Sequence, residues 1–191
     1  MVKLDRPEDT KTRRRRPVNK GEEPESATPL DPEKARRRVF QRAVKLLAAK
    51  QRSVTELRER LLEGRGASEA VVESVITRLL EYGYLDDARF AQSYASLRVQ
   101  QRPIGRQRLQ RDLWLKQIDK TTADAALDQV FEATPEVDLL NRAIEKRIRL
   151  RGRPKDRAEA KKLFDHLLRL GFTFELVSER VREMLTEREE E

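Results

Sequence analysis

The feature that most constrains the fold is a pair of leucines that recurs at nearly constant intervals. Each pair has a spacing of four residues inside an amphipathic segment, and it returns after 52 and then 54 residues. Residues four apart share one face of an α-helix, so each pair marks a helix that buries one stripe. A unit of about 50 residues that recurs in this way is typical of helical repeat proteins. The pairs are Leu57 and Leu61, Leu109 and Leu113, and Leu163 and Leu167.

Each repeat is predicted to contain three short helices. In the first repeat, Phe40 and Val44 lie on one apolar face of a helix that starts near residue 35. Ser53 with Glu56 three residues later has the pattern of a capping box, which starts a second helix. Ser68 is a suitable N-cap for a third helix with its own apolar stripe. The same order of apolar stripes and breaks then returns twice along the chain.

The stretch GYLDDARFAQSY, residues 83–94, is predicted to join the first two repeats. Its glycine suits the left-handed turn that closes a helix, and either of its aspartates suits the N-cap of the next one. The tyrosine and leucine between them are expected to form an apolar plug, and the new helix is expected to bury Tyr94 and Leu97 as well. The residues of this joint are Gly83, Tyr84, Leu85, Asp86, Asp87 and Phe90.

Composition favours an all-α class. Aromatic residues make up 5% of the chain and there are only 7 glycines, which fits helices better than a sheet. With 40% charged and 37% hydrophobic residues in a chain of 191, one thick core is not expected. We predict three tandem three-helix repeats in an elongated curved array, preceded by a disordered N-terminal arm. The boundaries are an arm at 1–34, repeats at 35–83, 84–134 and 135–186, and an acidic tail at 187–191.

The net charge of +8 predicts a polyanionic partner, because lysines and arginines that neutralise phosphates release counterions. Charge alone does not choose among DNA, RNA, a membrane surface and an acidic protein. The chain has no cysteine, so it forms no disulfide and has no thiolate chemistry. No apolar run of about 18 residues is present, and the arginine-rich start lacks the apolar stretch of a secretory signal. We therefore expect a cytoplasmic protein without membrane contact.

Basic residues gather in two clusters. Residues 98–116 carry several arginines against the single acid Asp112, and residues 142–153 place like charges on one helix face opposite Leu140 and Ile144. Like charges four apart cost about 0.2–0.5 kcal/mol per pair in an isolated helix, which favours a negatively charged partner. The alternative for both clusters is a solvated face. The candidate binding residues are Arg98, Arg102, Arg106, Arg108, Arg111, Arg142, Lys146, Arg149 and Arg153.

Residue types that carry chemistry are scarce. Trp114 lies between two leucines, a position compatible with partial exposure. Packing in the core is the favoured interpretation over stacking on a nucleobase. His166 is the only histidine, so neither a metal site nor a nucleophile is expected. No glycine-rich phosphate loop and no Ser/His/Asp order is present. We expect no enzyme activity, with no catalytic residue, metal or cofactor.

Three segments carry a more specific pattern. They are AVKLLAAKQRSVTELRERLL in the first repeat, LLEYGYLDDARFAQSYASLR across the joint, and RPIGRQRLQRDL in the second repeat. Together they resemble the RecX family of bacterial recombinase regulators, over roughly residues 35–185. The resemblance implies three tandem three-helix repeats that bind along the groove of the RecA filament. Ala67 and Gln117 depart from the family's pattern at the turns after two helices.

Two functions stay open. The resemblance implies a negative modulator of the RecA recombinase that restrains filament growth, ATP hydrolysis and strand exchange. Its expected partners are the RecA filament and single- or double-stranded DNA, and it is expected to act as a monomer. The alternative is a helical nucleic-acid-binding module that acts directly on DNA through basic helix faces, with steep salt dependence on naked duplex.

Overall fold

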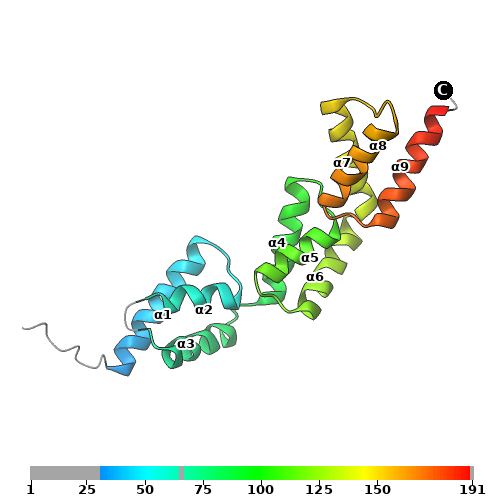
Figure 1. The fold of residues 1–191 in the computed structure, drawn as a ribbon. Helices are drawn as coiled ribbons and strands as arrows, with labels where there is room; N and C mark the ends of the chain where they lie inside the picture. The colour runs from blue at the N-terminus through cyan, green and yellow to red at the C-terminus, as the bar shows by residue number, and fades with distance from the viewer. Residues whose placement is uncertain (1–30, 65–66, 190–191) are drawn as a thin grey trace, which may run out of the picture. The chain divides into compact units, whose positions relative to one another are not determined.

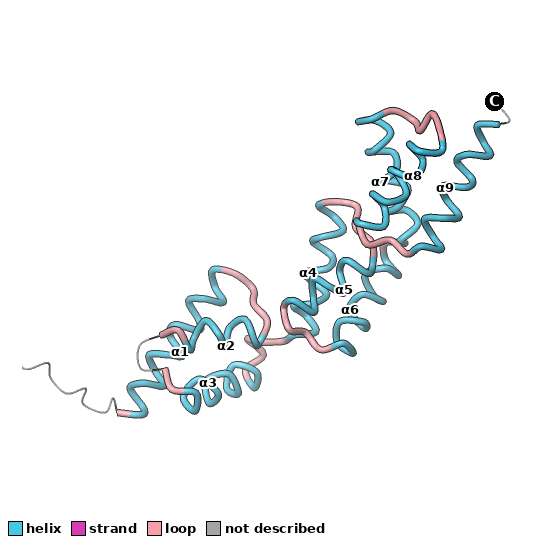
Figure 2. The backbone as a smooth tube through the Cα atoms, viewed as in Figure 1, coloured by secondary structure: helices cyan, strands magenta, loops and turns pink. Residues whose placement is uncertain are grey.

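The computed structural model describes residues 31–64 and 67–189, with side chains as far as Met184. Over these residues the chain forms nine α-helices and no strand (Figure 1 and Figure 2). The predicted all-α class and the succession of helix triplets are confirmed, and most of the predicted arm lies outside the described residues. The helices are α1 (Pro32–Ala49), α2 (Val54–Leu62), α3 (Glu69–Glu81), α4 (Asp87–Gln101), α5 (Arg106–Leu115), α6 (Lys120–Ala133), α7 (Glu136–Arg151), α8 (Arg157–Arg169) and α9 (Phe174–Glu189).

Local capping explains where the first helices begin. The side chain of Asp31 accepts a hydrogen bond from the Glu33 backbone and a proline follows at the first helical position, so α1 starts at Pro32 rather than at residue 35. At α2 both hydrogen bonds of the predicted capping box form, between Ser53 and Glu56. Ser68 caps α3, also as predicted.

The recurring leucines form the centre of two separate cores. All six side chains of the three pairs are at most 3% exposed. One core consists of apolar residues of α1, α2 and α3 together with Leu85, and the other extends from α4 through α9. The second and third helix triplets therefore share one apolar core, whereas the first triplet has a core of its own.

Two predicted stripes lie at a different rotation of their helices. Val44 is 42% exposed, because α1 buries Val39 together with the predicted Ala43. Leu97 is 53% exposed, and α4 buries Ala91, Ala95 and Val99 along with the predicted Phe90. Small residues at a helix surface let a neighbouring backbone approach closely, and α4 packs on α6 along this stripe.

The first two triplets meet at the N-terminus of α2. The Val54 amide donates to Asp87 Oδ1 at 2.9 Å, and the Ser53 hydroxyl donates to the Lys116 carbonyl oxygen at 2.9 Å. Lys116 Nζ then lies 2.7 Å from Glu56 Oε1. The Val54 amide lies at the start of α2 and the Lys116 carbonyl at the end of α5, where a helix leaves such groups without an internal partner. Each is hydrogen-bonded by a residue of the neighbouring triplet.

These contacts shift two carboxyl groups in opposite directions. Burial raises the pKa of Asp87, and nearby Asp119, Asp86 and Glu56 raise it further against the opposing hydrogen bond from Val54. Burial also acts to raise the pKa of Glu56, but its hydrogen bond to Lys116 and the charge of that lysine outweigh burial, and the net direction is down.

The second and third triplets meet through the same arrangement one repeat later. The Arg106 amide at the start of α5 donates to Glu136 Oε1 at 2.8 Å, as Val54 does to Asp87. The Gly105 amide donates to the Leu170 carbonyl oxygen at the end of α8, at 3.0 Å. In both cases an acid at the first position of the next triplet caps the second helix of the one before. Burial raises the pKa of Glu136, against the hydrogen bond from Arg106.

Candidate partner-binding surfaces

The basic cluster of residues 98–116 is largely paired within the protein. Arg98 Nη2 and Arg108 Nε each donate to Asp112 at 3.1 Å, one to each carboxylate oxygen. Asp112 is only 8% exposed, and the Tyr94 hydroxyl lies 3.5 Å from the same group. Asp112, the single acid of this cluster, is therefore the centre of a network that binds two of its arginines.

A third arginine of this cluster is also engaged. Arg106 Nη2 lies 2.6 Å from Asp128 Oδ1 on α6. Arg102 and Arg111 are exposed, and within the described part of the chain neither forms a salt bridge. Of the five candidates between residues 98 and 111, these two have charges available to a partner.

We expect Asp112→Asn to lower the free energy of unfolding by about 1.5–3 kcal/mol, because a charged acceptor of two arginines is lost from a buried position. Denaturant unfolding of the purified protein measures the change. Asp128→Asn is the matched control, since that carboxylate is 70% exposed and its ion pair should contribute less than about 1 kcal/mol. Equal effects of the two substitutions would contradict the central role of Asp112.

Trp114 is exposed, and the prediction that it packs in the core is wrong. Its exposed fraction is 70%, and that of the adjacent Leu115 is 66%. The core side of α5 is taken by the leucine pair and Asp112, so Trp114 points away from it. Arg111 lies three residues earlier on the same helix side. An indole and a free guanidinium thus stand together on the surface of α5.

The joint forms as predicted except for its tyrosine. Gly83 has φ +68°, Asp86 caps α4, and Leu85 and Phe90 are 3% and 7% exposed. Tyr84, however, is 62% exposed and meets Tyr82 edge to face at a ring separation of 6.2 Å. Of the two residues expected to plug the joint, only Leu85 is buried.

The candidate basic residues of α7 lie on one exposed face of the helix. Arg142, Lys146 and Arg149 are all exposed, and they form what we call the α7 basic face. Asp138 and Glu145 lie four residues from two of these cations, yet no salt bridge with the face forms among the described residues. Arg153 is exposed too but takes part in an interaction within the chain.

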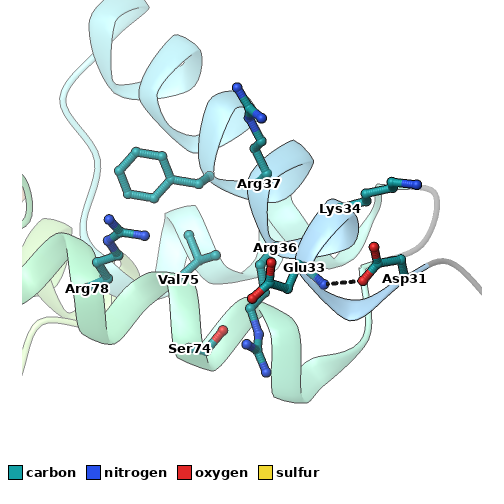
Figure 3. A pocket seen from close by; sticks show the side chains of 9 residues that line it. Asp31, Glu33, Lys34, Arg36, Arg37, Ser74, Val75 and Arg78 are labelled. Atoms are coloured by element: carbon teal, nitrogen blue, oxygen red, sulfur yellow. Dashed lines mark hydrogen bonds between the residues drawn. The ribbon is translucent and has the colours of Figure 1, made fainter.

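A cavity that is not among the predicted sites lies between α1 and α3 (Figure 3). It has a volume of about 630 Å³, and Phe40 and Val75 supply its apolar wall. Arg78 stands over the Phe40 ring at 5.3 Å and donates to the Tyr82 hydroxyl at 3.0 Å. The run of cations ahead of Phe40 was the available signal. Four cations and two carboxylates line the cavity: Lys34, Arg36, Arg37 and Arg78, with Asp31 and Glu33.

Few titratable groups have the setting of a catalytic site. His166 lies half-buried on α8, where burial and then the charges of Arg147 and Arg169 lower its pKa. Among residues 31–64 and 67–189, no group of three or more His, Asp or Glu side chains is placed to hold a metal ion. No helix in the described part of the chain is long and apolar enough to cross a membrane.

Comparison with known protein families identifies each of the first two triplets as a three-helix domain. Residues 40–79 match the model of the first RecX three-helix domain, and residues 86–127 match that of the second. The chain is 31% identical over 150 residues to the regulatory protein RecX of Prosthecochloris aestuarii, which is 78% of this chain and 95% of that protein. It is 40% identical over 110 residues to the regulatory protein RecX of Treponema pallidum (strain Nichols), of whose length the match spans 66%.

The fold has solved counterparts as well. The crystal structure of RecX from Lactobacillus salivarius superposes with a TM-score of 0.70 at 20% identity, over 79% of this chain and 97% of that chain. A crystal structure of regulatory protein RecX gives a TM-score of 0.68 at 23% identity, over 80% of this chain and 73% of that chain.

The helix triplets and their shared junctions define an all-α helical repeat protein. Sequence identity over nearly the whole length of a relative makes the assignment specific. The chain belongs to the RecX family of regulatory proteins.

Proposed function

We propose that this protein is a negative modulator of the RecA recombinase, without enzymatic activity of its own. It binds the RecA nucleoprotein filament and thereby restrains filament growth, ATP hydrolysis and strand exchange. Its binding surface includes the α7 basic face, with Arg102 and Arg111 as further contacts.

Membership of the RecX family supports the choice of partner, and the charges of the chain support the polarity of the surface. The observation that carries the assignment of the face is that Arg142, Lys146 and Arg149 repeat along one exposed side of α7 without a salt bridge in the described chain. Like charges at this spacing repel one another, and a polyanionic filament would relieve that repulsion.

A second candidate function is direct binding of single-stranded nucleic acid. The exposed Trp114 with Arg111 beside it favours this alternative, because an indole stacks on bases and a guanidinium contacts phosphates. Binding of this kind is sequence-tolerant and weakens steeply with salt.

The test is the inhibition of RecA ATP hydrolysis on single-stranded DNA at fixed salt. The double variant Arg142→Glu and Arg149→Glu is compared with Arg38→Glu and Lys45→Glu, which changes two exposed cations of α1 at the same seven-residue spacing. We expect the α7 variant to need at least about tenfold more protein for half-inhibition, and the α1 variant to differ little from the unchanged protein.

Binding to the same DNA without RecA is measured alongside, with circular dichroism to verify that each variant is folded. Inhibition far below the concentration that coats naked DNA supports filament recognition. Inhibition that occurs only once DNA is saturated would favour the second candidate. Equal inhibition by the two double variants would remove the α7 basic face from the proposal.

A further inference from the structure

A small cavity lies between the end of α7 and the middle of α8, on a side distinct from the α7 basic face. The two helices lie side by side (Figure 1), and together with Gly152 and Pro154 of the loop between them they line a volume of about 260 Å³. Ile148 and Leu163 line it with apolar surface. A cavity of this size is below the usual range of pockets for whole organic ligands, so it suits a compact group.

The polar lining is predominantly cationic. Arg147 and Arg151 come from α7 and Lys162 from α8, and the only carboxylate in the lining is Glu159. One oxygen of Glu159 already accepts the Lys155 amide at 2.8 Å. Among the described residues, none of the three cations forms a salt bridge.

Helix stability explains only part of this arrangement. Arg151 lies in the last turn of α7, where a cation is favoured by the helix dipole. Arg147 and Lys162 stand outside the final turn of their helices and gain no such benefit. Three like charges around one cavity repel one another, and a bound anion would relieve that repulsion.

We propose that this cavity binds a phosphate group through Arg147, Arg151 and Lys162. A guanidinium fork and an ammonium are the usual donors to phosphate oxygens, and the cavity holds both kinds. The phosphate belongs either to a nucleic-acid backbone, as a diester, or to a terminal or free phosphate, as a monoester. The site does not depend on recognition of RecA.

The only histidine of the chain is a built-in reporter for the cavity. His166 lies on α8 four residues beyond Lys162, and burial and the charges of Arg147 and Arg169 lower its pKa. The adjacent Asp165 is the nearest acid along the chain. A phosphate that neutralises Arg147 would favour the protonated imidazole, so the pKa of His166 should rise when the cavity is filled.

The experiment is an NMR titration of the His166 imidazole in the full chain, repeated with inorganic phosphate and with sodium chloride at the same ionic strength. We expect phosphate to raise its pKa by about 0.5 relative to chloride, the size of one partly screened charge at several ångströms. Lys162→Gln should weaken the phosphate affinity about fivefold, whereas Lys161→Gln, an exposed neighbour outside the cavity, should leave it unchanged.

Two oligonucleotides, with and without a 5′-phosphate, identify the source of the group. An equal response to both indicates a backbone diester, and a response only to the phosphorylated one indicates a monoester; either result supports the site. A response to phosphate no larger than that to chloride would overturn the proposal. So would equal losses in Lys161→Gln and Lys162→Gln, because screening of general surface charge would then account for the effect.

Discussion

Gly105→Ala is expected to lower the free energy of unfolding by about 3 kcal/mol or more. A Cβ at this position would overlap the backbone of Gly171 and Phe172. Backbone atoms do not rotate aside, so α5 and α8 would have to separate. Separation would break the bonds from the Gly105 amide to Leu170, at 3.0 Å, and from the Gln107 amide to Gly171, at 3.1 Å.

The sign of the effect is diagnostic. Gly105 has φ −84°, which any residue adopts, so alanine in open space there would stabilise the protein by about 0.4–1 kcal/mol. Gly83→Ala is the control. The alanine methyl group would meet nothing within 4 Å there, but the φ of +68° is unfavourable for any residue with a side chain. This substitution should cost about 1–2 kcal/mol. A neutral or stabilising Gly105→Ala would mean that the contact between α5 and α8 is absent in solution.

Leu85→Ala is expected to cost about 2–5 kcal/mol in the same unfolding measurement, because a buried leucine leaves a cavity when it is truncated. Leu85 is 3% exposed and packs in the first core, and its amide donates to the Leu79 carbonyl oxygen at 3.3 Å. The joint between the first two triplets therefore depends on this side chain.

Leu97→Ala provides the matched control for Leu85→Ala. The chemical change is identical, but Leu97 is 53% exposed, so the expected cost is about 0.5 kcal/mol or less. Similar costs for the two leucines would place Leu85 at the surface and contradict its role as the plug.

Local patterns predicted the helices well because the signals that set them are local. The capping box of Ser53 and Glu56 and the left-handed glycine at position 83 act within a few residues, and both form as expected. The leucine pairs repeat with the period of the fold, so they marked the core of every triplet. Rotation of a helix about its axis was harder to predict, as Val44 and Leu97 show, because neighbouring apolar and small residues compete for the buried side.

The candidate surfaces depended on contacts between distant residues, which no local pattern contains. Arg98 and Asp112 are 14 residues apart in sequence and pair only because α4 and α5 pack together. The charge pattern of the sequence predicts that Arg98 is available to a partner, whereas in the structure it is paired with Asp112. Trp114 was misplaced for a related reason, since its aromatic character favoured burial and its position on α5 faces away from the core.

The polar contacts between the first two triplets at the start of α2, which we call the polar seam, affect the cooperativity of unfolding. Because the apolar residues of α1–α3 and of α4–α9 form separate clusters, each cluster is a candidate foldon with its own opening free energy. The seam couples them through Ser53, Asp87 and the ion pair of Glu56 with Lys116. Ionic strength weakens an ion pair more than an apolar core, so salt should loosen the coupling before it affects either foldon. Amide exchange in α1–α3 would then become independent of exchange in the rest of the chain.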